Sequence, residues 1–176
     1  MSLEFNRRSF LKYSAAAAVA VAGSSLLVGC GEDEYQKTGK IGSTLKLMGA
    51  FKLESAKLDS APTATAADKT LTCNFSLKCT SKYGLNIVPA NFQVEVTSKA
   101  TKKVTTYHAY NTDSTGKISL SNSNNYLKKD ESLDTVLKVT NIKVADGDTI
   151  KVKFWPRPQA SEGSQAYTRA FCTWSM

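Results

Sequence analysis

Three cysteines, Cys73, Cys79 and Cys172, are the residues whose chemistry depends most directly on spacing. Cys73 and Cys79 lie six residues apart in a segment that alternates apolar and polar residues. In a strand, at about 3.3 Å per residue, their Cα atoms should be about 20 Å apart. A disulfide requires a Cα separation below about 7 Å, so these two cannot pair with each other. A disulfide from Cys172 to either of them is geometrically possible, and Cys79 is preferred; the remaining cysteine is then a buried apolar filler.

Catalytic, metal and cofactor sites find little support among the remaining residues. His108 is the only histidine, no G-x-S-x-G motif occurs, and Cys-x₅-Cys on one strand cannot converge on a single metal ion. Asp146-Gly147-Asp148 lacks the spacing of a calcium loop and is predicted to be a hairpin turn. The carboxylates Asp130, Glu131 and Asp134 are expected to be solvated in a loop. We therefore predict no catalytic residues, no metal and no cofactor.

A candidate binding surface lies around Trp155 and Arg157. If Phe154 points inward at the end of a strand, Trp155 points outward, where it can contact a sugar ring or a protein partner. The alternative is a tryptophan folded over the edge of the domain. Lys151 and Lys153 fall on one face of the same strand, and they form either a basic surface for anionic polymers or an ordinary solvated face.

The N-terminal segment carries a recognisable pattern, Asn6-Arg7-Arg8-Ser9-Phe10-Leu11-Lys12, followed by the apolar run of residues 15–28. This run is short and weakly apolar for a membrane span, which needs about 20 apolar residues. Arg7, Arg8, Phe10, Leu11 and Lys12 resemble the core of a twin-arginine export signal. That resemblance implies passage of a folded chain through the twin-arginine translocase. The alternative is an ordinary secretion signal that contains two arginines.

The end of the apolar run, Leu27-Val28-Gly29-Cys30, resembles a bacterial lipobox. The resemblance implies that lipoprotein-processing enzymes attach a diacylglyceryl group and palmitate to Cys30, which then begins the mature chain. Several acyl chains hold a protein stably at a bilayer, whereas one does so only marginally. The expected location is the outer face of the cell membrane, or the outer membrane if the cell has two.

Three segments follow from these patterns: a signal peptide over residues 1–29, a lipidated cysteine with a flexible tether over 30–43, and a domain over 44–176. The tether is predicted from its charge, its glycines and its lack of periodicity. The whole chain has a net charge of +8. Removal of Arg7, Arg8, Lys12 and one acidic residue with the signal leaves +6, which favours anionic partners.

Period-two alternation over residues 44–176 predicts an all-β domain without a long helix. In residues 71–80, LTCNFSLKCT, the cysteines, Phe75 and Leu77 share one face. We expect about eight strands, at residues 45–58 (bent or split near Gly49), 71–80, 91–97, 103–110, 117–121, 135–141, 149–155 and 166–174. Strands with this spacing indicate an immunoglobulin-like antiparallel β-sandwich of seven to eight strands.

The order of these segments resembles a family of small immunoglobulin-like bacterial lipoproteins related to secreted mycobacterial immunoprotective antigens. The resemblance rests on the run LTCNFSLKCTS, the strand NFQVEV, the element DGDTIKVKF and a last strand that ends in an aromatic residue. It implies a fold and a surface location, and no activity.

We accordingly expect a membrane-anchored, non-enzymatic binding or interaction module that meets an envelope polymer or protein. The alternatives are a structural or assembly component of the envelope without a small ligand and, from another class, an accessory hydrolase or redox component. Nucleic-acid binding is not expected, because the chain has an export pattern and lacks a basic-aromatic motif.

Overall fold

The computed structural model describes residues 35–60, 68–109, 116–122, 126–157, 159–161, 164–166 and 170–176. The chain divides into two units, residues 1–32 and 33–176, and every described residue belongs to the second. The export pattern and Cys30 lie outside the described residues. Within the described ranges no helix has the length and apolar character needed to cross a membrane.

One of the two main sheets has the strand order β2-β3-β4-β10-β8. Its long strands β3, β4 and β10 are paired antiparallel, with Ala56 opposite Cys73 and Cys73 opposite Leu137. A bulge between Leu53 and Ser55 interrupts the β3–β4 pairing. The bounds of the strands are β2 Thr44–Lys46, β3 Gly49–Ser60, β4 Asp68–Cys79, β8 Ile118–Leu120 and β10 Ser132–Lys143.

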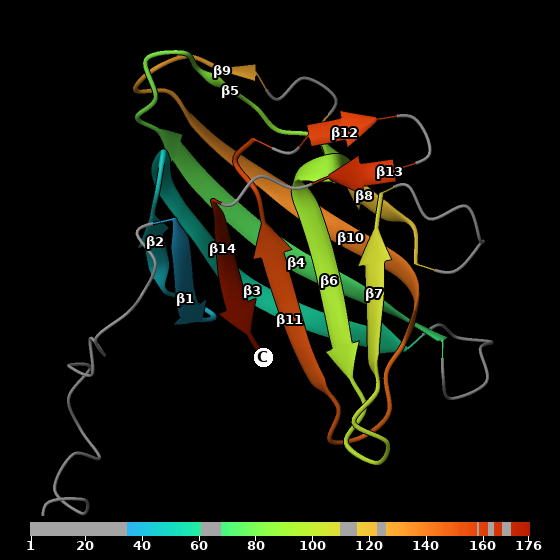
Figure 1. The fold of residues 1–176 in the computed structure, drawn as a ribbon. Coiled ribbons are helices and arrows are strands. Elements are labelled where there is room, and N and C mark those ends of the chain that lie inside the picture. Colours follow the sequence, from blue (N-terminus) through green and yellow to red (C-terminus); the bar gives the residue numbers. More distant parts are fainter. Residues whose placement is uncertain are drawn as a thin grey trace, which may run out of the picture. The chain divides into compact units, whose positions relative to one another are not determined.

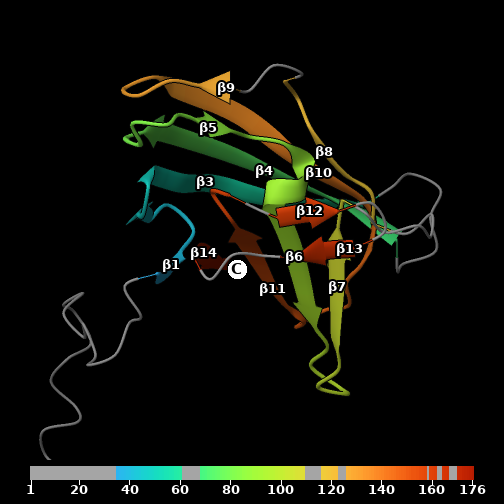
Figure 2. The same cartoon turned by 45° about the horizontal axis from the view of Figure 1, so that its top comes forward.

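The second sheet has the order β1-β14-β11-β6-β7 and forms the other layer (Figure 1; Figure 2). Its strands are β1 Gln36–Lys40, β6 Phe92–Thr97, β7 Val104–His108, β11 Thr149–Phe154 and β14 Phe171–Ser175. The orders β3-β4-β10-β8 and β14-β11-β6-β7 correspond to strands A-B-E-D and G-F-C-C′ of an immunoglobulin-type sandwich. The predicted all-β immunoglobulin-like class is therefore confirmed.

Short elements fill the connections between these strands. Two small pairs, β5 with β9 and β12 with β13, lie outside the main sheets, and a 3₁₀ turn precedes β6. Their bounds are β5 Leu85–Asn86, η1 Pro89–Asn91, β9 Tyr126–Leu127, β12 Gln159–Ser161 and β13 Ser164–Ala166.

The core consists of the inward residues of both sheets, as the alternation predicts. Phe75 of β4 contacts Phe92, Phe154 and Trp174 of the opposite sheet, with ring centroids 5.1, 4.9 and 5.8 Å away. All four rings are almost fully buried. Large aromatic rings in such tilted and edge-on contacts contribute strongly to packing between sheets.

The tether prediction is wrong from residue 36 onward. Gln36–Lys40 form β1, which pairs in parallel with β14 from Gln36 opposite Phe171 to Lys40 opposite Ser175. The segment is polar because it is an edge strand, with its outward side chains partly exposed, so its sequence lacks the alternation of a half-buried strand. The predicted split near Gly49 is correct, since β3 begins at that residue.

The turn at Asp146-Gly147-Asp148 is present, but it is not a hairpin. It joins β10 of one sheet to β11 of the other. Gly147 has a φ of +83°, which a residue with a side chain rarely adopts. The Asp148 carboxylate accepts the backbone N–H groups of Lys99 and Ala145 at 2.9 and 3.0 Å. The turn thereby holds the connection after β6 against the connection after β10.

Candidate functional site

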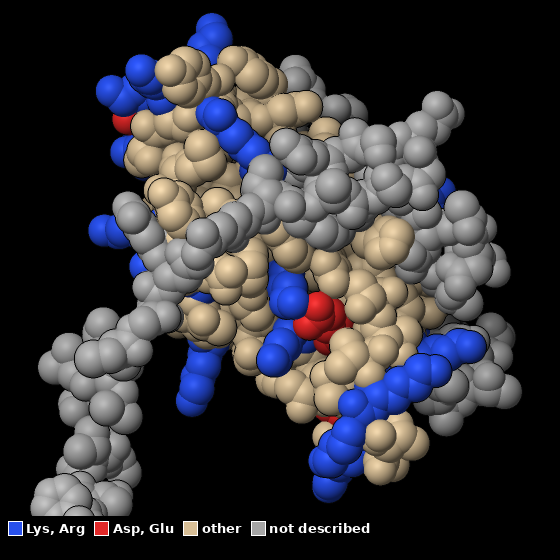
Figure 3. All heavy atoms as spheres, in the orientation of Figure 1, with Lys and Arg blue, Asp and Glu red and all other residues tan. Residues whose placement is uncertain are grey.

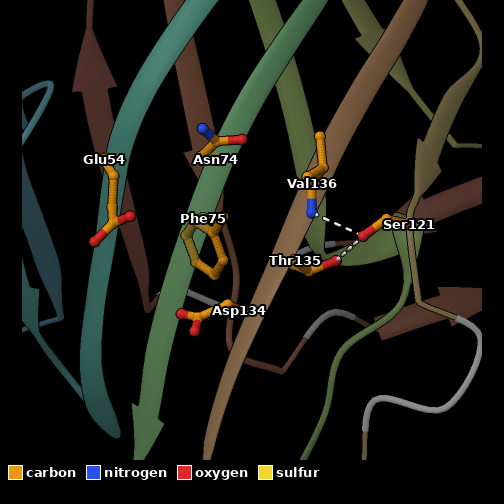
Figure 4. Close-up of a pocket in the computed structure, with 7 residues that line it drawn as sticks. All are labelled: Glu54, Asn74, Phe75, Ser121, Asp134, Thr135 and Val136. Carbon is orange, nitrogen blue, oxygen red and sulfur yellow. Dashed lines mark hydrogen bonds between the residues drawn. The ribbon is translucent and has the colours of Figure 1, made fainter.

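A solvent-open groove of about 320 Å³ lies on the outer face of the β3-β4-β10-β8 sheet. Figure 4 shows its lining residues on β3, β4, β10 and the segment after β8. Most of them carry short polar groups, and Phe75 closes the groove from beneath because its side chain belongs to the core. The lining residues are Glu54, Asn74, Phe75, Ser121, Asp134, Thr135 and Val136. We call this the sheet groove.

The strand pairing explains how the sheet groove forms. Asn74 lies opposite Val136 on one side and Ser55 on the other, so short side chains meet across β4. The bulge next to Glu54 changes the register of β3 at this point. Bulges commonly re-aim a side chain, and Glu54 is a lining residue.

Hydrogen bonds fix the neutral groups of the sheet groove. Asn74 Nδ2 donates to Ser55 Oγ at 2.8 Å. Ser121 Oγ accepts the backbone N–H of Val136 at 3.0 Å and lies 3.3 Å from Thr135 Oγ1, as the dashed lines in Figure 4 show. Ser121 Oγ also donates to Asn122 Oδ1 at 3.3 Å, and an amide oxygen, a backbone amide and a hydroxyl are not bases that would activate Ser121 as a nucleophile.

Two carboxylates give the sheet groove its acceptor character. Glu54 Oε1 lies 3.5 Å from both Lys52 Nζ and Ser76 Oγ, which are long and weak contacts. Asp134 is exposed, and its backbone carbonyl, rather than its carboxylate, accepts the side chain of Asn122 at 3.0 Å. Carboxylates are acceptors, so the arrangement suits a ligand that presents hydroxyl or ammonium donors.

A second surface lies at the end of the sandwich where β4 and β11 finish. The connections that follow β4, β8 and β11 meet there, and we call this surface the loop end (Figure 1). Tyr83 is 69% exposed, with Lys82 Nζ 4.8 Å and the Arg157 guanidinium 5.6 Å from its ring centroid. Tyr126 is 56% exposed. Exposed tyrosines beside cations are typical of contact surfaces.

Of the two interpretations of Trp155, the exposed contact residue is wrong, and its burial agrees with the alternative of a tryptophan folded over the edge of the domain. Its side chain is 5% exposed and packs against Phe171 with ring centroids 5.2 Å apart. Trp155 follows the end of β11, so the alternation that placed it outward no longer applies. Its backbone N–H donates to the backbone carbonyl of Asn91. Arg157 is exposed and donates to Ser81 Oγ at 3.1 Å, beside Tyr83 rather than Trp155.

Lys151 and Lys153 lie on the outer face of the other sheet and differ in their surroundings. Lys153 Nζ is 2.6 Å from Glu95 Oε1, and both side chains are less than one quarter exposed. Lys151 is exposed. Of the two lysines predicted to form a basic or a solvated face, Lys151 is therefore exposed, whereas the charge of Lys153 is paired with that of Glu95.

The cysteines lie as the strand prediction requires, with Cys73 and Cys79 at different positions of β4. All three are buried, and all three are free thiols in this structure, so it does not contain the predicted Cys79–Cys172 bridge. Burial raises the pKa of Cys73 to about 12. Burial also raises the pKa of Cys172 to about 12, against a smaller opposing effect of Lys37.

His108 lies on β7 opposite Gln93, and its buried Nδ1 has no hydrogen-bond partner among the residues that the structure describes. No cluster of three or more metal-binding side chains occurs among the residues that the structure describes. The sequence did not single out Tyr83, Tyr126, Glu54 or Asn74. The alternation predicts only that the side chain of Asn74 points outward from its strand. Which residues lie beside it depends on pairing between strands that are distant in the sequence.

Residues 4–24 match the family of TAT (twin-arginine translocation) pathway signal sequences. The predicted twin-arginine signal is thus confirmed, and the chain carries an export signal. No curated protein matches the chain. The relation to mycobacterial antigens finds no support in these comparisons and stays a prediction.

Solved structures resemble the chain at low identity. A candidate lipoprotein of Bacillus subtilis, ycdA, is 15% identical with a TM-score of 0.47, over 78% of this chain and 38% of that protein. The yjhA protein of B. subtilis is 10% identical with a TM-score of 0.45, over 77% and 98%. The archaellum periplasmic stator protein FlaG of Sulfolobus acidocaldarius is 9% identical with a TM-score of 0.36, over 69% and 98%. The chain spans well under half the length of ycdA, and likenesses this distant carry no functional argument.

Proposed function

We propose that this protein is a lipid-anchored, extracytoplasmic and non-enzymatic binding module, and that the sheet groove binds a glycan of the cell envelope. The twin-arginine signal at residues 4–24 supports export of the folded domain. Leu27-Val28-Gly29-Cys30 directly follows this signal and supports lipidation at Cys30. The translocase and the lipoprotein-processing enzymes are then partners during export.

The observation that carries the ligand class is the acceptor-rich character of the sheet groove. Glu54, Asp134 and Asn74, each of which has a side-chain oxygen, line this one open groove of about 320 Å³. Sugars present hydroxyl donors in neighbouring pairs, and amino sugars add an ammonium group, so both complement such acceptors. A groove open to solvent along a sheet also accommodates an extended polymer rather than a small enclosed molecule.

The arrangement favours binding over catalysis. Hydrolysis of a glycan by two carboxylates requires one of them to act as an acid while the other acts as a base or nucleophile. This division of roles requires the two carboxylates to lie in different environments, usually one of them buried. Here Glu54 and Asp134 are both exposed at the surface of the sheet.

The export part of this proposal is tested by replacing the arginine pair in the full chain. Arg7→Lys with Arg8→Lys should leave the protein in the cytoplasm, whereas Lys12→Arg, which preserves charge outside the pair, should not change export. Export of the double lysine variant at the normal level would contradict the twin-arginine route. Metabolic labelling with palmitate should mark the exported chain and disappear in Cys30→Ala; label that persists would refute the anchor.

The ligand part is tested by calorimetry with soluble peptidoglycan fragments and amino-sugar oligosaccharides. Asn74→Ala and Asp134→Asn should each weaken binding about tenfold, which corresponds to about 1.4 kcal/mol. Thr72→Ala, on the same face of β4 but outside the groove lining, should bind as the unchanged protein does. If the anchored, exported protein binds none of these glycans, the groove assignment fails and a structural role in the envelope replaces it.

A further inference from the structure

The N-terminal strand β1 begins at the loop end of the domain. Gln36 lies opposite Phe171 at the start of the parallel β1–β14 pair, and the Phe171 N–H donates to the carbonyl of Tyr35 at 2.8 Å. Phe171 follows the connection from β11, whose end at Phe154 lies opposite Cys172. The chain therefore enters the domain at the end where β11 finishes.

Covalent geometry limits how far this end can lie from a bilayer. Only four residues separate Cys30 from Tyr35. At most about 3.6 Å per residue, the five steps span no more than about 18 Å. This step rests on the lipid anchor of the proposed function. Because β1 is part of the sheet, the domain has no longer tether with which to move away from the membrane.

Hydrogen bonds show that the connections of the loop end belong to one surface. Asp130 N–H donates to the carbonyl of Cys79 at 2.8 Å, and Thr80 N–H donates to that of Met48 at 3.2 Å. Arg157 reaches Ser81 from the connection after β11. The pairing of β5 with β9 further joins the connection after β4 to the connection after β8.

The exposed side chains of this end have the composition of a membrane-contacting surface. Tyr35, Tyr83 and Tyr126 are 47%, 69% and 56% exposed. Tyrosine is enriched where proteins meet the headgroup region, because its ring is apolar and its hydroxyl is polar. Figure 3 shows basic side chains gathered over the top of the domain, where the connections after β4 and β9 lie. The exposed basic residues of the loop end are Lys46, Lys82, Lys128, Lys129 and Arg157.

A hollow of about 460 Å³ adjoins the start of β1. Leu47 and Met48 supply apolar groups, and Lys37 and Lys46 supply ammonium groups. Tyr35 and Ala170 complete its lining. Apolar groups beside cations match the boundary between anionic headgroups and acyl chains.

We propose that the loop end docks on an anionic phospholipid surface, so that the domain is held against the membrane at two places, by the lipid on Cys30 and by this protein surface. Carboxylates at this end weaken the attraction between the basic residues and anionic headgroups; they are Asp130, Glu131 and the acidic residues Glu32, Asp33 and Glu34 near the anchor. The anchor compensates for this, because a tethered surface meets the bilayer at a high effective concentration and weak contacts then suffice.

The test uses the lipidated mature protein that begins at Cys30, expressed from the full chain, purified from membranes and reconstituted in vesicles with brominated acyl chains. Tyr83→Trp places a fluorescent reporter at the loop end, and the unsubstituted chain corrects for its two native tryptophans. We expect bromine quenching of the added tryptophan to be at least about twofold greater in vesicles that contain phosphatidylglycerol than in pure phosphatidylcholine. When Lys82→Ala, Lys128→Ala and Lys129→Ala are combined in the same reporter chain, quenching should become equal in the two kinds of vesicle.

The matched control carries Lys102 and Lys103→Ala, which are exposed lysines in the connection between β6 and β7 and should leave quenching unchanged. Vesicle flotation separates the two proposals. A chain that floats with the vesicles but shows no added quenching, or equal quenching in both lipids, overturns docking and leaves the anchor intact. A chain that does not float contradicts the anchor and this inference with it.

Discussion

The indole Nε1 of Trp174 donates a hydrogen bond of 3.0 Å to the backbone carbonyl of Ser43. Trp174 is fully buried, and its ring meets Phe75 edge-on. Ser43 lies in the connection between β1 and β2. The Trp174 side chain of β14 therefore links the core to the connection in which the chain passes from β1 of one sheet to β2 of the other.

Trp174→Phe should loosen β1 and destabilise the domain. The substitution leaves space in the core and removes the donor to the Ser43 carbonyl, which is partly buried, so its loss costs less than the roughly 1–3 kcal/mol of a fully buried unsatisfied group. Urea unfolding should show a loss of about 2–4 kcal/mol, with faster amide exchange in residues 36–40. Tyr107→Phe is the control, since it removes the hydroxyl that accepts the Lys143 N–H at 3.0 Å elsewhere. Equal exchange in β1 for both variants would contradict the role of Trp174.

Much of the fold was predictable because alternation records burial directly. In β4 the inward phase of Cys73, Phe75 and Leu77 is visible in sequence, and the structure buries all three. Gly49 marks a real break, because a Cβ there would lie 2.4 Å from the carbonyl oxygen of Lys78. A close backbone approach of this kind leaves a recognisable glycine in the sequence.

The candidate sites were less predictable, because they depend on partners far along the chain. Arg157 was expected to flank Trp155 in a binding surface, but its aromatic neighbour is Tyr83, which lies 74 positions earlier. The burial of Trp155 depends on Phe171, contributed by a different strand. Glu54 and Asn74 line the same groove because a bulge changes the register of β3 at Glu54. No local sequence pattern predicts this change of register.

Reversing the charge of Lys153 should cost more than reversing that of Lys151. Lys153→Glu places a second carboxylate beside Glu95, where the present ion pair measures 2.6 Å and is shielded from water. Lys151 is exposed, so Lys151→Glu should change the free energy of unfolding by less than about 0.5 kcal/mol. Urea titration of both variants checks this. A loss for Lys153→Glu no greater than that for Lys151→Glu would argue against a stabilising pair.

The cysteine thiols should be unreactive in the folded protein. A thiol with a pKa of about 12, as burial imposes on Cys73 and Cys172, contains almost no thiolate at pH 8. In a Cys30→Ala chain, iodoacetamide should therefore label the folded domain very slowly and add three groups once guanidinium unfolds it. If the unfolded chain instead gains only one group, and gains three when a reductant is added before labelling, the disulfide that the sequence suggested would be established.

Asp148 should make stability fall in acid. Hydrogen bonds from the Lys99 and Ala145 amides hold its pKa below the usual range, with a smaller effect of Lys69 in the same direction. A carboxyl whose pKa is lower in the folded state stabilises the fold fully above its unfolded pKa of about 3.9. That contribution is lost as the pH falls from about 5 through the folded pKa.

Asp148→Ala should therefore lower the melting temperature at pH 7, and the difference between the variant and the unchanged protein should shrink progressively below about pH 4. Asp146→Ala is the matched control, because no amide hydrogen bond to its carboxylate is found among the described residues, and it should lower the melting temperature at pH 7 by less than Asp148→Ala does. A pH-independent deficit in Asp148→Ala would show that the aspartate acts through backbone conformation. In that case the hydrogen bonds from the Lys99 and Ala145 amides would not stabilise the fold more when the Asp148 carboxylate is charged than when it is protonated.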